Sequence, residues 1–300
     1  VIAIVHYLLN SYSIDTITDY VNYYEIKQGF SNFLKKTAVR KSKVSHLTKF
    51  LKPIIKRNKE QLPIISLKEN YENAKSSPEI VKTTFDLSVA REKSKEYGIS
   101  RENYLYLKLV ETIFKFYSKQ DSANTCIISN TRNLRLNLIN LTDETLGNYS
   151  GRKIVRFDRQ NGYDFKEYVK EYNKKADANS SFLELIQEWL SLQKLNRLPR
   201  TLLNWIIKRM NNPSNFTATF TYMPFRSSIL MPSKFLNRYQ TELIDYSFYV
   251  RVAKQIVPYF MVLPDTRNNY SILLTFNEAY MNKAKASKLL NLYKDLLVNG

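Results

Sequence analysis

The sequence contains little cysteine and little glycine, and each shortage excludes a class of site. One cysteine, Cys126, among 300 residues rules out an internal disulfide framework and a cysteine-rich zinc site. The six glycines form no glycine-rich phosphate loop, and neither an HExxH motif nor a paired Cys/His ligand set is present. We therefore expect no metal and no permanently bound cofactor, and the cysteine usage favours the reducing cytoplasm.

Long hydrophobic runs are also missing. No apolar segment approaches the ~20 residues that a membrane-spanning helix needs, and no basic segment precedes a signal-like stretch. The hydrophobic content of 44% and aromatic content of 13% are nevertheless enough for a sizeable core. The sequence therefore predicts a globular chain of one large domain or two lobes, without a membrane span.

Acidic residues are few, at 27 against 46 basic ones, which gives a net charge of +19. Residues 26–59 contain eleven Lys and Arg and no acid, and they include apolar residues at helical spacing, Leu47, Phe50, Leu51, Ile54 and Ile55. A solvated helix packed on its apolar side explains this segment. A docking face for a polyanion, such as nucleic acid, an acidic carrier protein or the phosphates of coenzyme A, explains it too.

The first residues form the most informative stretch. Val1–Val5 is β-branched enough for a buried strand, and it ends at His6, one of only two histidines. Asn10 and Ser11 follow in a polar loop. An imidazole at a strand end is suited to act as a general base near neutral pH, but a core histidine with a satisfied hydrogen bond gives the same pattern.

The spacing His6-x-x-x-Asn10-Ser11-x-Ser13 resembles the HHxxxDGxS signature of the chloramphenicol-acetyltransferase-like acyltransferases. That family includes the condensation domains of nonribosomal peptide synthesis and the alcohol and polyketide O-acyltransferases. The second histidine of the family motif is catalytic, and the resemblance implies this role for His6. Val5, Asn10 and Ser11 depart from the signature, and Asn10 and Ser11 take the places of its structural aspartate and glycine.

The order of elements after the polar connector of residues 68–78 also resembles the family's second lobe. We expect a strand over 81–87, a charged helix over 88–97 closed by Gly98, and a buried helix that Ser100 caps. Strands over 126–129 and 153–157 follow, and then helices over 165–189 and 192–210. Arg132 matches the family's structural arginine, and an ordinary surface charge is the alternative. Gly147-Asn148 matches the family's Gly-Asn turn, and ordinary turn chemistry is the alternative.

Residues 215–222 form a strand where the family has the strand beside its active-site tunnel, so the resemblance implies that Thr219 and Tyr222 line a substrate tunnel. The family's Ser-Asn-Gly and the DFGWG motif of its plant branch are absent. A hairpin of strands over 251–263 and 270–276 and an amphipathic helix over 284–297 close the chain.

These observations predict an α/β protein with the two-lobed chloramphenicol-acetyltransferase-like fold, in which mixed sheets with flanking helices meet at a cleft. Residues 1–68 are expected to end the N-terminal lobe, and residues 69–300 to form the C-terminal lobe. The apolar Val1–Val5 strand needs a neighbour, so we expect further polypeptide, upstream or from a partner chain, to pair with it.

The function that the resemblance implies is acyl transfer from a thioester to a hydroxyl or amine. His6 acts as general base, and the donor is acyl-coenzyme A or an acyl group on the phosphopantetheine of a carrier protein. A non-catalytic binding module on the same scaffold, or a basic nucleic-acid-binding protein, is the alternative. The departures at Val5, Asn10 and Ser11 favour the non-catalytic binding module. The net charge favours the nucleic-acid-binding protein.

Overall fold

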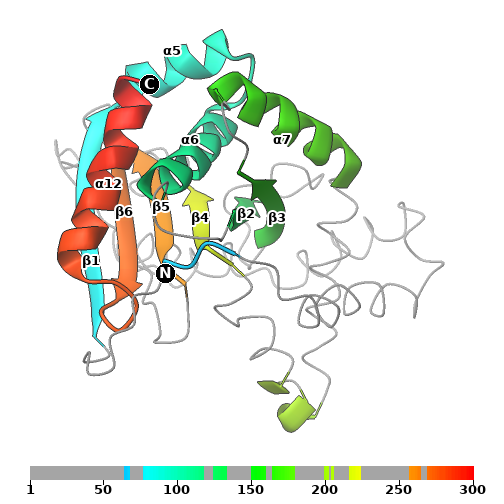
Figure 1. Cartoon of the computed structure of the whole chain (residues 1–300), viewed down its shortest axis with the longest axis vertical. Coiled ribbons are helices and arrows are strands. Elements are labelled where there is room, and N and C mark those ends of the chain that lie inside the picture. Colours follow the sequence, from blue (N-terminus) through cyan, green and yellow to red (C-terminus); the bar gives the residue numbers. More distant parts are fainter. Residues whose placement is uncertain are drawn as a thin grey trace, which may run out of the picture.

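The computed structural model describes residues 64–67, 77–117, 124–133, 150–159, 164–179, 199–202, 204–205, 216–223, 257–264 and 269–300. Their main body is a mixed six-stranded sheet with helices packed on one face (Figure 1). His6, Asn10, Ser11, Asn148 and the basic segment 26–59 lie outside the described residues. None of the helices in the described ranges is long and apolar enough to span a membrane.

The elements of this body follow one another as β1 (Pro78–Asp86), α5 (Leu87–Glu96), α6 (Arg101–Phe116), β2 (Thr125–Asn133), β3 (Ser150–Asp158), α7 (Phe165–Asn179), β4 (Ala218–Tyr222), β5 (Tyr259–Pro264), β6 (Asn269–Asn277) and α12 (Lys283–Val298). In the sheet the strands lie in the order β1-β6-β5-β4-β2-β3. The strand β4 is parallel to both of its neighbours, β2 and β5, whereas all other pairs are antiparallel.

Side chains that favour helix ends set the limits of three helices. Asp86, Ser100 and Asn282 cap α5, α6 and α12, and each accepts a hydrogen bond from a backbone N–H of the first turn. Gly98 has φ of 65°, which residues with a Cβ rarely adopt, and this allows the sharp turn between α5 and α6. The predicted strand, charged helix, glycine turn and capped helix are therefore confirmed.

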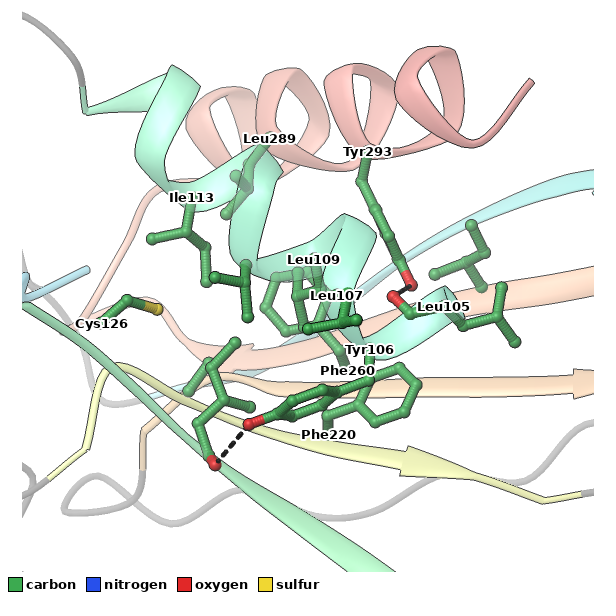
Figure 2. Packing of buried hydrophobic residues seen from close by; sticks show 14 of the residues in the cluster. Leu105, Tyr106, Leu107, Leu109, Ile113, Cys126, Phe220, Phe260, Leu289 and Tyr293 are labelled. Carbon is green, nitrogen blue, oxygen red and sulfur yellow. Dashed lines mark hydrogen bonds between the residues drawn. The ribbon is translucent and has the colours of Figure 1, made fainter. Parts of the chain in front are cut away.

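The helix α6 lies in the middle of the core, between the sheet and α12. Tyr106 packs against Phe220 of β4 at 5.8 Å between ring centroids, and its hydroxyl donates to the Ile128 carbonyl of β2 at 3.2 Å. From the other side, the Tyr293 hydroxyl of α12 donates to the Leu105 carbonyl at 2.8 Å (Figure 2). The apolar side chains all round α6 are explained by this placement, because every face of the helix has a neighbour.

The strands present different side chains to the two faces of the sheet. Their helix-side positions are aromatic or aliphatic and fully buried, as in Phe220, Phe260 and Leu274. The helix-free face, on which the intervening residues lie, carries several hydroxyl side chains. This second face is where the candidate site is found.

The short segment 64–67 joins the same body. Ile64 forms a parallel bridge with Thr125, and the Ile65 N–H donates to the Thr125 carbonyl at 2.8 Å. Ile65 and Leu67 are buried in the main core. The division of the chain into lobes at residue 68 stays a prediction.

Candidate functional site

Four hydroxyl side chains cross the helix-free face in one row. The strand register places Ser129 of β2 opposite Thr219 of β4, Thr219 opposite Tyr259 of β5, and Tyr259 opposite Thr275 of β6. Because neighbouring strands are about 4.8 Å apart, this hydroxyl row is roughly 14 Å long and runs across the strands. Thr219, which the sequence assigns to the tunnel, is a member of it.

The hydroxyl row contains a buried group without a protein partner. Ser129 is 2% exposed, and its Oγ forms no hydrogen bond with the described residues. Ser271, on the same face of β6, is 1% exposed and is equally unsatisfied within the described ranges. A buried hydroxyl without a partner costs about 1–3 kcal/mol, so both side chains fit hydrogen bonding to a bound molecule or to water.

A neighbouring hydroxyl on this face has a structural task instead. The Thr217 Oγ1 accepts the Ile127 N–H at 3.1 Å, at a buried position beside the first residues of β4. Cys126, adjacent in β2, is fully buried, and burial raises the pKa of its thiol to about 12. A buried thiol that stays protonated is a weak nucleophile, which argues against a role of Cys126 in covalent catalysis.

These contrasting environments predict different effects for two similar substitutions. Ser129→Ala removes a hydroxyl without a described partner, so the free energy of unfolding should stay the same or rise, by at most about 1–3 kcal/mol. Thr217→Val should cost about 1–3 kcal/mol, because it leaves the Ile127 N–H buried and unpaired. Urea denaturation measures both variants. A loss in Ser129→Ala as large as that in Thr217→Val would show that the Ser129 hydroxyl serves the fold.

Tyr222, the second predicted tunnel residue, lies on the opposite face from Thr219. Its hydroxyl is 2.5 Å from the Tyr270 hydroxyl, which also accepts a hydrogen bond from Arg101 at 3.4 Å. Burial, followed by the bond to Tyr222, raises the pKa of Tyr270 well above its usual value. Since residues three apart in a strand face opposite sides, a channel along one face is lined by Thr219 or by Tyr222. Both assignments stay predictions.

Arg132 lies in β2, opposite Gly151 of β3. Two residues before it, the buried Asn130 donates its side-chain N–H to the Glu102 carboxylate of α6 at 3.3 Å. The Asn130–Glu102 hydrogen bond links β2 to the first turn of α6. The role of Arg132 as the structural arginine stays a prediction.

Three members of the hydroxyl row, Ser129, Tyr259 and Thr275, were not identified from the sequence. The only sequence signal for this row is that several predicted strands carry hydroxyl residues at alternate positions. The sequence does not reveal which strands are neighbours, so it does not show that these residues form a row. Within the described ranges, no group of three or more His, Cys, Asp or Glu side chains is placed to hold a metal ion.

Comparisons with known proteins identify the fold. Neither a protein-family model nor a curated protein matches the sequence. Among solved structures, the chain is similar to SgcC5 from Streptomyces globisporus, with 12% identity, a TM-score of 0.56, and coverage of 91% of this chain and 58% of that one. It is also similar to the X-domain from teicoplanin biosynthesis, with 11% identity, a TM-score of 0.53, and coverage of 90% and 57%.

A third similar structure is the EpoB cyclization-docking bidomain of a nonribosomal peptide synthetase from Sorangium cellulosum, with 10% identity, a TM-score of 0.54, and coverage of 89% and 50%. The chain thus spans 50–58% of the length of these three structures. At such identities the likeness shows the fold alone. The protein has an α/β fold of the condensation-domain type, and this is the chloramphenicol-acetyltransferase-like fold that the sequence predicts.

Proposed function

We propose that the protein transfers an acyl group from a thioester to a hydroxyl or amine. The observation that carries this proposal is the fold, which it shares with the X-domain from teicoplanin biosynthesis and with a cyclization-docking bidomain of a nonribosomal peptide synthetase. The His6-x-x-x-Asn10 spacing at the start of the chain supports the same reaction class. The donor is acyl-coenzyme A or an acyl group on the phosphopantetheine of a carrier protein.

In the proposed reaction, His6 takes the proton of the acceptor hydroxyl or amine as that group attacks the thioester carbonyl. A carbon–oxygen or carbon–nitrogen bond forms, the carbon–sulfur bond breaks, and the protonated imidazole returns the proton to the leaving thiolate. No covalent enzyme intermediate is needed. Asn10 and Ser11 shape the loop that presents His6, and Arg132 and Asn148 support the site.

We place the phosphopantetheine arm of the donor along the hydroxyl row. A phosphopantetheine arm is extended and carries amide groups, and these can exchange hydrogen bonds with Ser129 and Thr219. The unsatisfied Ser129 hydroxyl supports a ligand with polar groups in this place. The excess of basic residues, +19 in net charge, supports a donor that is an acidic carrier protein or carries phosphates.

The direct test measures the thiol that acyl transfer releases. The protein is incubated with a panel of acyl-coenzyme A and acyl-carrier donors together with alcohols and amines, and free thiol is followed with a chromogenic disulfide. We expect thiol and acylated acceptor in equal amounts with at least one pair. Thiol release no faster than in buffer for every pair would contradict the proposal.

The charge also favours a second candidate, a non-catalytic module that binds nucleic acid. Filter binding to duplex and single-stranded DNA over a salt series separates the two functions, because phosphate contacts make affinity fall steeply with salt. Saturable, salt-sensitive binding without thiol release would select this second function.

A further inference from the structure

Two large apolar side chains, Leu202 and Trp205, are exposed among the residues that the structure describes. Leu202 is 43% exposed and Trp205 is 49% exposed. Both belong to a helical segment, because residues 200–202 and 204–205 are helical, and a separation of three residues puts them on one side of it. Figure 1 shows this segment (yellow-green) apart from the sheet and from the helices that cover it. The segment therefore presents an apolar surface to the outside of the molecule.

The sequence around this segment has the pattern of a basic amphipathic helix. At helical spacing, the helix predicted over 192–210 has one apolar side, to which Leu202 and Trp205 belong, and one polar side. The polar side carries basic residues and no acid: Lys194, Arg197, Arg200 and Lys208. The lack of acid extends further, because residues 189–241 contain eight Lys and Arg but neither Asp nor Glu. An anion is therefore the partner that fits the polar side.

The exposed leucine and tryptophan distinguish among anionic partners. Basic side chains alone neutralise the phosphates of a nucleic acid, and a leucine adds little to such contacts. At the surface of an anionic bilayer, by contrast, leucine gains by leaving water, and an indole lies favourably at the level of the headgroups. Lys and Arg gain there from the negative surface potential. Leu202, Trp205 and Arg200, all exposed, supply these three interactions from one short segment.

We propose that the helical segment around Leu202 and Trp205 binds the surface of a membrane that contains anionic lipids. The two apolar side chains enter the headgroup region, and Arg200 lies toward the lipid phosphates. The contact is peripheral, in the plane of the interface. Because only two large apolar side chains are exposed, binding is reversible, depends on the charge of the lipids and weakens as salt is added.

Tryptophan fluorescence tests the proposal at the residue concerned, because the chain contains only two tryptophans, Trp189 and Trp205. The variant Trp189→Phe leaves Trp205 as the only indole, and Trp205→Phe is the matched control. With vesicles of phosphatidylcholine and phosphatidylglycerol, we expect the emission of Trp189→Phe to shift to shorter wavelength and to be quenched by brominated acyl chains. The emission of Trp205→Phe should keep its wavelength with the same vesicles.

Co-sedimentation with these vesicles measures the affinity. Replacing Leu202 and Trp205 together by Ser should weaken binding at least tenfold, because two apolar side chains no longer leave water. Arg200→Gln should weaken binding about fivefold through the loss of one positive charge near the lipid surface. Both variants should unfold at the wild-type temperature, because the replaced side chains are exposed. Neither measurement uses a thioester, so both are independent of acyl transfer.

Several results would overturn the proposal. The first is an unchanged Trp205 emission with the anionic vesicles, and the second is equal binding to vesicles of phosphatidylcholine alone. Duplex DNA or polyglutamate that shifts this emission when vesicles do not would assign the segment to a nucleic acid or to an acidic protein. A double Ser variant that sediments like wild type would place the membrane contact on another basic surface of the chain.

Discussion

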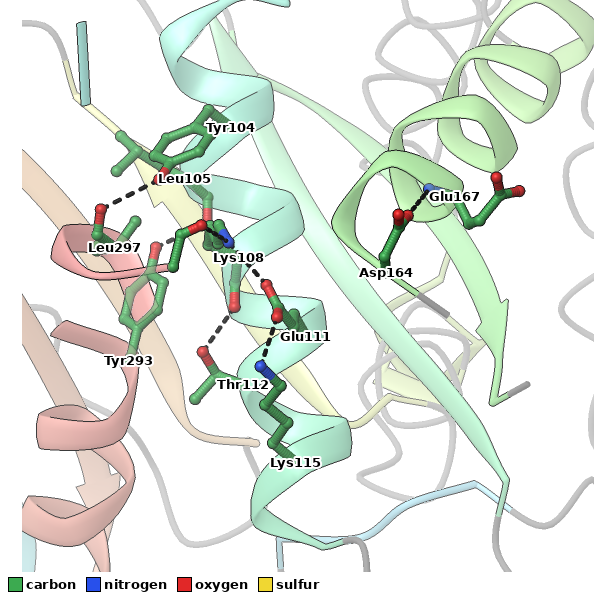
Figure 3. Close-up of polar contacts among 11 residues, drawn as sticks. Tyr104, Leu105, Lys108, Glu111, Thr112, Lys115, Asp164, Glu167, Tyr293 and Leu297 are labelled. Atoms are coloured by element: carbon green, nitrogen blue, oxygen red, sulfur yellow. Dashed lines mark hydrogen bonds and ion pairs between the residues drawn. The ribbon is translucent and has the colours of Figure 1, made fainter. Parts of the chain in front are cut away.

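Replacing Glu111 with Gln is expected to lower the free energy of unfolding by about 3 kcal/mol at neutral pH. Lys108 is 1% exposed, and its Nζ lies 2.9 Å from the Glu111 carboxylate, which also pairs with Lys115 at 2.7 Å (Figure 3). The same Nζ is 4.0 Å from the centroid of the Phe165 ring and donates to the Gly300 carbonyl at 3.2 Å. Without Glu111, a buried ammonium group loses its only anionic partner among the described residues.

The pH dependence of this loss follows from the pKa of Lys108. Burial lowers that pKa below its usual value, and Glu111 opposes the effect. In the Gln variant the folded-state pKa falls further, so the folded protein releases this proton at a lower pH than the unfolded chain does. Stability therefore rises as pH increases from the lowered folded pKa toward the unfolded value of about 10.4. The deficit relative to wild type should be largest near pH 7 and smaller at pH 9.5.

Urea denaturation at the two pH values measures this difference. The matched control is the double substitution Lys108→Met with Glu111→Leu, because exchanging a buried ion pair for apolar side chains is often neutral or stabilising. A Gln variant within about 0.5 kcal/mol of wild type at pH 7 would show that Lys108 finds enough solvation without its carboxylate.

Local signals in the sequence predicted the elements of this fold well. Ser100 and Gly98 marked the turn between α5 and α6, and the hairpin of β5 and β6 was expected from its turn residues. The same signals did not identify the Lys108–Glu111 pair. A helix that is apolar nearly all round is predicted to be buried, but its pattern does not show that a lysine within it is buried as well.

The candidate site was only partly predictable, since it depends on strand order. Ser129 and Thr219 are 90 residues apart and become neighbours because β4 lies parallel to β2. The sequence contains no local signal for such a pairing. The predicted tunnel residues Thr219 and Tyr222 come from one strand, and the structure places their side chains on opposite faces of the sheet.

Replacing His6 with Ala is expected to reduce the turnover number for acyl transfer by about 10²–10⁴-fold, the usual effect of removing a general base. The Michaelis constant for the thioester donor should change little, because the base acts on the acceptor's proton in the transition state and adds nothing to donor binding. Thiol release under saturating donor measures the first quantity, and a donor titration measures the second. Turnover equal to wild type would exclude His6 as the base.

The pH profile distinguishes loss of a base from loss of a fold. A neutral imidazole is needed to accept the proton, so wild-type kcat/KM should rise with pH through about 6.5 and then level off. In His6→Ala this rise should be absent, and the small remaining rate should follow hydroxide or the acceptor's own ionisation. The chain has only one other histidine, His46, and His46→Ala is therefore the matched control. Because the two variants remove the same group from different places, a rise that persists in His6→Ala and disappears in His46→Ala would transfer the catalytic role to His46.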